Sequence, residues 1–171
     1  MKKNCLIVIS NFYPVISNNL LKGTVKILRD NKIKYDLRIV DGCFEIPQLV
    51  NILLKRKKYS FCVVLGCIIK GQTPHFSLLS KTVINEIMQI SLKYSCPIGY
   101  GVISCINKKQ AIIRSSGKKN KGAEATKAAI SILKNIWIMI PSLRLAVVQK
   151  IYEKTTSSNK DISFKKHPYQ R

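Results

Sequence analysis

The sequence predicts an α/β protein, built as a three-layer α/β/α sandwich with a central four-stranded parallel sheet. Four short runs rich in apolar residues, at 5–10, 35–40, 61–66 and 97–104, have the length and composition of strands. Longer segments with apolar residues at helical spacing lie between them. Strands that alternate with helices form successive βαβ units, which place helices on both faces of a parallel sheet. The expected fold is therefore flavodoxin-like.

The first strand–helix unit begins with CLIVIS at 5–10, which has the composition of a buried strand. A turn is expected at 11–14, because an asparagine and a proline flank two aromatic residues there. Ser17 is a suitable N-cap for the helix that follows. The apolar face of that helix is expected to contain Leu20, Leu21, Val25, Ile27 and Leu28.

The second unit begins at 35–40, where apolar and polar residues alternate as in a half-covered strand. A turn at 41–43 leads into a second helix, which opens at 44–47 and is expected to run to about Lys57.

The third unit carries the most unusual loop of the chain. The buried strand at 61–66 is expected to stop at Gly66, and Pro74 suits the first turn of a helix that runs to about Tyr94. The loop between them ends in His75, a side chain that exchanges protons near neutral pH. The inward face of this helix is expected to contain Phe76, Leu79, Val83, Ile87, Met88 and Ile90.

After the fourth strand, a short helix is expected at 108–113, a loop at 114–121 and a last helix at 121–138. With 171 residues, of which 46% are hydrophobic, the chain fits one domain, expected at 1–140. The extension at 141–171 is expected to be disordered in its last part, where polar residues dominate.

The composition also constrains the compartment and the chemistry. No apolar run approaches the roughly 18 residues that span a bilayer, so no membrane segment is expected. The six cysteines form no CxxC pair and lie mostly in apolar runs, which favours free thiols in a reducing compartment. We therefore expect a cytoplasmic protein without disulfides and without a metal site.

The formal net charge of +22 suggests a nucleic-acid partner at first sight. However, the lysines are spread along the whole chain and are not interleaved with aromatic residues, as they are in many nucleic-acid-binding surfaces. The abundance of Lys, Ile and Asn is also typical of a bias in the coding sequence. We therefore predict that the protein has no specific nucleic-acid partner. Sequence-independent adhesion to polyanions is still expected, because it needs only charge.

Unusual residues follow the predicted strands. Phe12 follows the first, Phe44 and Glu45 follow the second, and the loop at 70–75 follows the third. The carboxyl ends of parallel strands share one edge, where α/β proteins bind ligands. Aromatic faces, a carboxylate, an imidazole and nearby cations would suit a flat heteroaromatic ring and a phosphate.

Each of these residues also has an ordinary interpretation. Phe12 and Tyr100 could be core residues, and Glu45 is favourable in a first helical turn simply by charge–dipole attraction. Arg114 and Lys121 could be solvated surface charges.

Four separated stretches carry more specific combinations of residues. They are SNFYPVISNNLLKG (10–23), DGCFEIP (41–47), GCIIKGQTPHF (66–76) and AIIRSSGKKNKGAEA (111–125). In this order they resemble the motifs of the 6,7-dimethyl-8-ribityllumazine synthase family, over about residues 5–138. The resemblance implies a transferase of riboflavin biosynthesis that condenses 5-amino-6-(D-ribitylamino)uracil with 3,4-dihydroxy-2-butanone 4-phosphate. Phosphate and water are released, and no cofactor is implied.

The resemblance also implies roles for individual residues. His75 takes the position of the proton-transfer residue. The pyrimidine and its ribityl chain are expected to contact Phe12, Cys43, Phe44, Glu45, Cys67, Ile68, Ile69 and Tyr100. The phosphate is expected to contact Gln72, Thr73, Arg114 and Lys121.

Family sites lie between neighbouring subunits, so the resemblance implies a homopentamer, with a shell of twelve pentamers as the larger alternative, and a functional link to riboflavin synthase. The chain departs from the family pattern at Asn11 and Lys70, where arginine is common, and in a shorter loop at 115–121. Two other functions stay open: a module that binds a lumazine or flavin without turnover, and a polyanion-binding scaffold.

Overall fold

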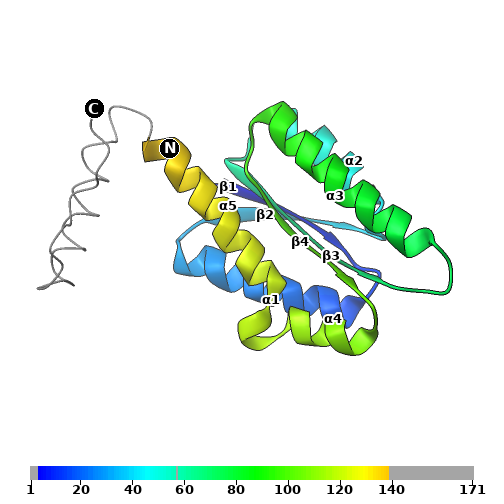
Figure 1. Ribbon diagram of the computed structural model, residues 1–171. Helices are drawn as coiled ribbons and strands as arrows, with labels where there is room; N and C mark the ends of the chain where they lie inside the picture. The colour runs from blue at the N-terminus through cyan, green and yellow to red at the C-terminus, as the bar shows by residue number, and fades with distance from the viewer. Residues whose placement is uncertain (1–3, 57, 139–171) are drawn as a thin grey trace, which may run out of the picture. The chain divides into compact units, whose positions relative to one another are not determined.

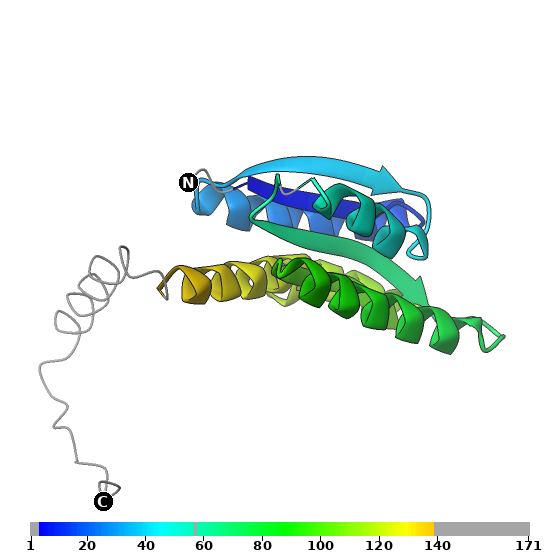
Figure 2. The same ribbon diagram turned by 90° about the horizontal axis from the view of Figure 1, so that it is seen from above.

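The strands of this protein form one parallel sheet between two layers of helices (Figure 1). The computed structural model describes residues 4–56 and 58–138. The strands, in the spatial order β2-β1-β3-β4, are β1 (Asn4–Ser10), β2 (Lys34–Val40), β3 (Phe61–Ile69) and β4 (Ile98–Cys105). All three pairings are parallel, which confirms the predicted three-layer fold. Figure 2 shows β2 at one edge, followed by β1 and β3.

The helices divide between the two faces of the sheet (Figure 1). One face is covered by α2 (Glu45–Leu54) and α3 (His75–Tyr94). The other is covered by α1 (Pro14–Asp30), α4 (Lys108–Ser115) and α5 (Lys121–Ile138), and the 3-10 turn η1 (Gly117–Lys119) joins α4 to α5. The contacts between residues place the chain up to Leu133 in one compact unit. A second unit begins at Lys134, and its described residues, 134–138, form the last turn of α5.

The core is centred on β1 and β3, because each of these inner strands has a neighbour on each side and a helix layer on each face. Every residue from Phe61 to Ile68 is buried. The edge strand β2 is only partly covered, as its alternating sequence predicted, and Ile39 on it is 62% exposed.

The strand β3 runs past Gly66 to Ile69, so the prediction that it stops at this glycine is wrong. The reason is packing. A Cβ at position 66 would lie 2.6 Å from the Cys43 sulfur and 3.3 Å from the Ser10 Cβ. Gly66 therefore permits close approach within the strand, and the three extra residues carry Cys67 and Ile68 towards the sheet edge.

Smaller differences concern helix ends and faces. The first helix begins at Pro14, and Ser17 is not its cap: the buried Ser17 hydroxyl donates to the Ser10 carbonyl oxygen at 2.6 Å. The second helix ends at Leu54, earlier than expected. On α3, Met88 is 58% exposed and points away from the core, whereas Val83, Ile87 and Ile90 are buried as predicted.

All six cysteines are free and buried, as expected of thiols that act as small hydrophobes. In the described part of the chain, no helix is long and apolar enough to cross a membrane. The predicted domain boundary near residue 140 and the predicted disorder of the extension lie outside the described residues.

Candidate functional site

A pocket of about 280 Å³ lies where β1, β2 and β3 end and α3 begins. It brings together eight of the residues that the sequence analysis assigned to a site: Phe12, Cys43, Phe44, Glu45, Cys67, Ile68, Ile69 and His75. Tyr13, Gly42 and Leu79 complete its lining. Four segments that are far apart in the sequence therefore meet at the edge of the sheet.

The two phenylalanines of the pocket are not core residues. Phe12 is 67% exposed and Phe44 is 66% exposed. The ring of Phe12 packs edge to face on the ring of Tyr13, with centroids 5.0 Å apart and an interplanar angle of 75°. Large exposed aromatic faces at the mouth of a pocket can stack on a flat ring.

The inner wall of the pocket is apolar and contains two buried thiols. The Cys43 thiol points towards the Cys67 carbonyl oxygen, with a sulfur–oxygen distance of 3.7 Å. Burial raises the pKa of the Cys43 thiol and raises the pKa of Cys67 to about 12. Both thiols are therefore protonated at neutral pH, and neither is a nucleophile in this form.

Glu45 occupies the first turn of α2 and remains exposed. One of its carboxylate oxygens accepts a hydrogen bond from the Gly42 backbone N–H at 3.1 Å. This bond closes the turn between β2 and α2, so part of the role of Glu45 is the structural one that its position favours.

His75 is the first residue of α3 and is exposed at the mouth of the pocket. The Pro74 carbonyl oxygen accepts the first helical hydrogen bonds, from the N–H groups of Ser77 and Leu78. The earlier N–H groups of this helix have no intrahelical partner, and such a terminus attracts anions. Gln72 and Thr73 lie exposed in the preceding loop and are not part of the pocket lining.

Three predicted site residues lie elsewhere. Tyr100 is in the middle of β4, half-buried against the core on the α2–α3 side. Arg114 is exposed in the last turn of α4, in the opposite helix layer. Lys121 opens α5 and forms an ion pair with Glu124. None of these three side chains lines the pocket described above.

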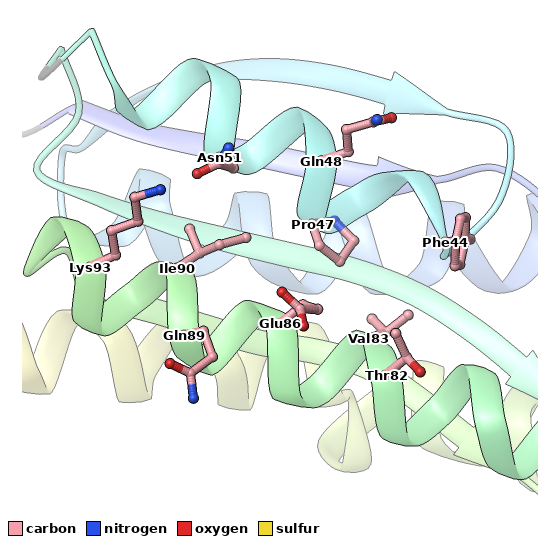
Figure 3. Close-up of a pocket in the computed structure, with 10 residues that line it drawn as sticks. All are labelled: Phe44, Pro47, Gln48, Asn51, Thr82, Val83, Glu86, Gln89, Ile90 and Lys93. Atoms are coloured by element: carbon pink, nitrogen blue, oxygen red, sulfur yellow. The ribbon is translucent and has the colours of Figure 1, made fainter.

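A second depression, of about 550 Å³, runs between α2 and α3 (Figure 3). Its walls combine polar and apolar side chains, with Glu86 near its middle and Lys93 at the end far from Phe44 (Figure 3). Phe44 lines both this groove and the pocket. The other lining residues are Pro47, Gln48, Asn51, Thr82, Val83, Gln89 and Ile90.

Sequence reasoning missed Tyr13, Gly42 and Leu79 as pocket residues. Tyr13 was assigned to a turn, but α1 begins at Pro14, which makes Tyr13 the last residue before the helix and turns it to the pocket. Burial raises the pKa of the Tyr13 phenol, and the neighbouring thiols of Cys67 and Cys43 raise it further. The signal that could have found Tyr13 is its position directly after Phe12.

Comparison with known proteins gives one consistent result. The family described as 6,7-dimethyl-8-ribityllumazine synthase matches residues 2–136. A relative of that name from Buchnera aphidicola subsp. Baizongia pistaciae is 38% identical over 143 residues, which cover 81% of this chain and 90% of that protein. Relatives of the same name from Bartonella bacilliformis and Helicobacter acinonychis are 37% and 38% identical. These matches cover 75% and 74% of this chain, and 86% and 84% of those proteins.

Among solved structures, a GDP-L-fucose synthetase from Naegleria fowleri matches with a TM-score of 0.36 and 12% identity, over 90% of this chain and 46% of that chain. A likeness at that level carries no conclusion about fold or function. The matches in sequence, by contrast, span most of the chain and include all the motifs that shape the pocket. This chain belongs to the 6,7-dimethyl-8-ribityllumazine synthase family.

Proposed function

We propose that the chain condenses 5-amino-6-(D-ribitylamino)uracil with 3,4-dihydroxy-2-butanone 4-phosphate in the pocket at the sheet edge, with release of phosphate and water. The observation that supports this most is the convergence of Phe12, Phe44 and His75 on one pocket from three separate segments. The product is 6,7-dimethyl-8-ribityllumazine, which supplies the functional link to riboflavin synthase.

The residue types suit each step of this condensation. Phe12 and Phe44 stack on the pyrimidine, and the backbone of 67–69 contacts its polar edge. The amine of the pyrimidine attacks the ketone, and the resulting imine loses phosphate through proton shifts, for which His75 is the donor and acceptor. Much of the remaining acceleration comes from holding the two substrates together.

The phosphate of the second substrate is proposed to sit near the start of α3. The free N–H groups at the start of that helix attract an anion, and the side chains of Gln72 and Thr73 in the adjoining loop provide further hydrogen-bond donors. As the phosphate departs, fixed donors stabilise its growing charge more effectively than water does.

We further propose that a neighbouring subunit supplies Tyr100, Arg114 and Lys121, because these residues do not line the pocket of their own chain. Two surfaces support an assembly. Apolar side chains are exposed along α3, namely Leu78, Ile84, Met88 and Leu92. The groove between α2 and α3 borders the pocket at Phe44 (Figure 3). The proposed assembly is a homopentamer, with a shell of twelve pentamers as the larger alternative.

The test of function is direct. Purified protein mixed with both substrates is expected to form a fluorescent lumazine, at a rate that depends on both concentrations. A module that only binds would show ligand binding by calorimetry without product, and that result would contradict the proposed reaction.

Arg114→Ala is expected to weaken the use of the butanone phosphate. A hydrogen bond between a cation and phosphate contributes about 1.5–3 kcal/mol, which corresponds to roughly tenfold to a hundredfold in affinity. The KM for the butanone phosphate should rise accordingly, with a smaller change in kcat, and binding of the pyrimidine should stay nearly constant. Arg29→Ala removes an exposed arginine of the same helix layer and serves as the control. A loss of pyrimidine affinity instead would show that Arg114 does not hold the phosphate.

Light scattering is expected to give the mass of five chains or a multiple of five, and a truncated chain that ends at Lys154 should assemble with the same number of subunits. Met88→Glu should shift the distribution towards smaller species, because it places a charge on the exposed apolar stripe of α3. Asn18→Glu, on exposed α1 surface, is the matched control. A fully active monomer would contradict the shared site.

A further inference from the structure

One helix layer carries an excess of positive charge. Residues 14–30 and 108–133, which form α1, α4, η1 and most of α5, contain ten lysines and arginines but only Asp30 and Glu124 as acidic residues. The helices α2 and α3 contain two lysines and two glutamates, so their charges balance. Figure 1 shows that these two groups of helices lie on opposite faces of the sheet.

A groove runs through the basic layer. It has a volume of about 830 Å³ and lies between α1 and the segment from Ser115 to Lys127. Four lysines line it: Lys22 and Lys26 from α1, Lys118 from η1 and Lys127 from α5. All four are exposed, and within the described residues none of them forms an ion pair. Asp30, in the last turn of α1, is the one acidic residue of its lining and offsets part of this charge.

The floor of the groove is held by buried polar contacts. The Asn120 side-chain amide donates to the carbonyl oxygens of Asn19 at 2.7 Å and Ser115 at 2.6 Å. The Asn19 amide donates to the Ser116 hydroxyl at 3.4 Å. These bonds tie the loop between α4 and α5 to α1, so the groove keeps its shape without a ligand.

The chemistry of the lining indicates the kind of ligand. Lysine presents a point charge that attracts phosphate without demanding one orientation. The described residues that line the groove include no aromatic side chain, so the groove offers no surface on which bases could stack. It therefore suits a chain of phosphates, not a sequence of bases.

We propose that this groove binds the phosphate backbone of a linear polyanion, either a single-stranded nucleic acid or inorganic polyphosphate, independently of sequence. The site lies on the opposite side of the sheet from α2 and α3 and shares no lining residue with the substrate pocket. Arg114 and Lys121, which we propose to serve a neighbouring subunit, adjoin the segment that walls the groove but do not line it.

The test uses the full chain, with a fluorescent oligouridylate and with polyphosphate as competitor. Binding to single strands loses about 0.7 units of log K per unit of log salt for each neutralised phosphate. Four lysines then give a slope of about −3, and affinity should fall about fiftyfold between 50 and 200 mM salt. Lys26→Gln combined with Lys127→Gln should reduce the slope to about −1.4 and lower affinity at least tenfold at 50 mM salt.

The control removes the same charge from the same layer. Lys108 and Lys109 are exposed at the start of α4 and do not line the groove, so their double change to Gln should lower affinity less than threefold. Equal losses in the two variants would show that net charge alone attracts the polyanion and would overturn the proposal. Failure of polyphosphate to displace the oligouridylate would overturn it too, because the bases would then carry recognition. The polyanion that binds more tightly identifies the source of the phosphates.

Discussion

Replacement of His75 by alanine is expected to slow lumazine formation by about ten- to a thousandfold, without loss of stability. General acid–base groups typically contribute a hundredfold or more, whereas the proximity of the two substrates would survive the change. The side chain is exposed at the start of α3, so its removal leaves no cavity in the core. Steady-state rates at saturating concentrations of both substrates measure this effect.

The control is His75→Gln, which keeps a polar side chain at the pocket but cannot transfer a proton near neutral pH. It should be about as slow as the alanine variant, with both KM values within a few-fold of the original. An unchanged turnover in either variant would remove His75 from the mechanism.

Replacement of Asn120 by alanine is expected to cost about 3 kcal/mol of unfolding free energy. The side chain is buried, and its amide serves the carbonyl oxygens of Asn19 and Ser115. Its oxygen also accepts the Ala123 N–H at 3.0 Å, which caps α5. Alanine would remove all three of these hydrogen bonds and would leave the Ser115 carbonyl oxygen and the start of α5 without their Asn120 partner.

A matched control distinguishes this network from ordinary capping. Asn107 caps α4 by accepting the Gln110 N–H at 3.0 Å, but it is exposed and makes one such contact. Asn107→Ala should cost about 1 kcal/mol. Urea unfolding of the two variants at one protein concentration gives the comparison. Equal losses would mean that Asn120 acts only as a helix cap.

The fold follows from the sequence because each strand is a short apolar run and each helix has a clear apolar face. The errors lie where tertiary contacts decide. Gly66 looked like a strand end, but its lack of a side chain makes room for the Cys43 sulfur, which belongs to a different strand–helix unit. Ser17 looked like a cap, but its hydroxyl bonds back to Ser10.

The site divides in a similar way. Residues directly after strand ends, such as Phe12 and Glu45, were predictable as pocket residues because parallel strands end at one edge. The position of Arg114 outside this pocket was not predictable in this way, since it depends on how α4 packs in the opposite layer, and periodicity says nothing about that. Tyr13 depended on where α1 begins, which a sequence pattern defines only to within a few residues.

Phe44 forms part of two hollows at once, the pocket at the sheet edge and the groove between α2 and α3 (Figure 3). Any chain that fills the groove therefore touches a wall of the pocket. If that contact changes the affinity for the pyrimidine by some factor, thermodynamic reciprocity requires the pyrimidine to change the affinity between chains by the same factor. The apparent affinity for the pyrimidine then depends on the enzyme concentration, because dilution separates the chains and separation changes the pocket. For the same reason, removal of the pyrimidine changes how strongly the chains associate, so that either effect can be used to measure the coupling.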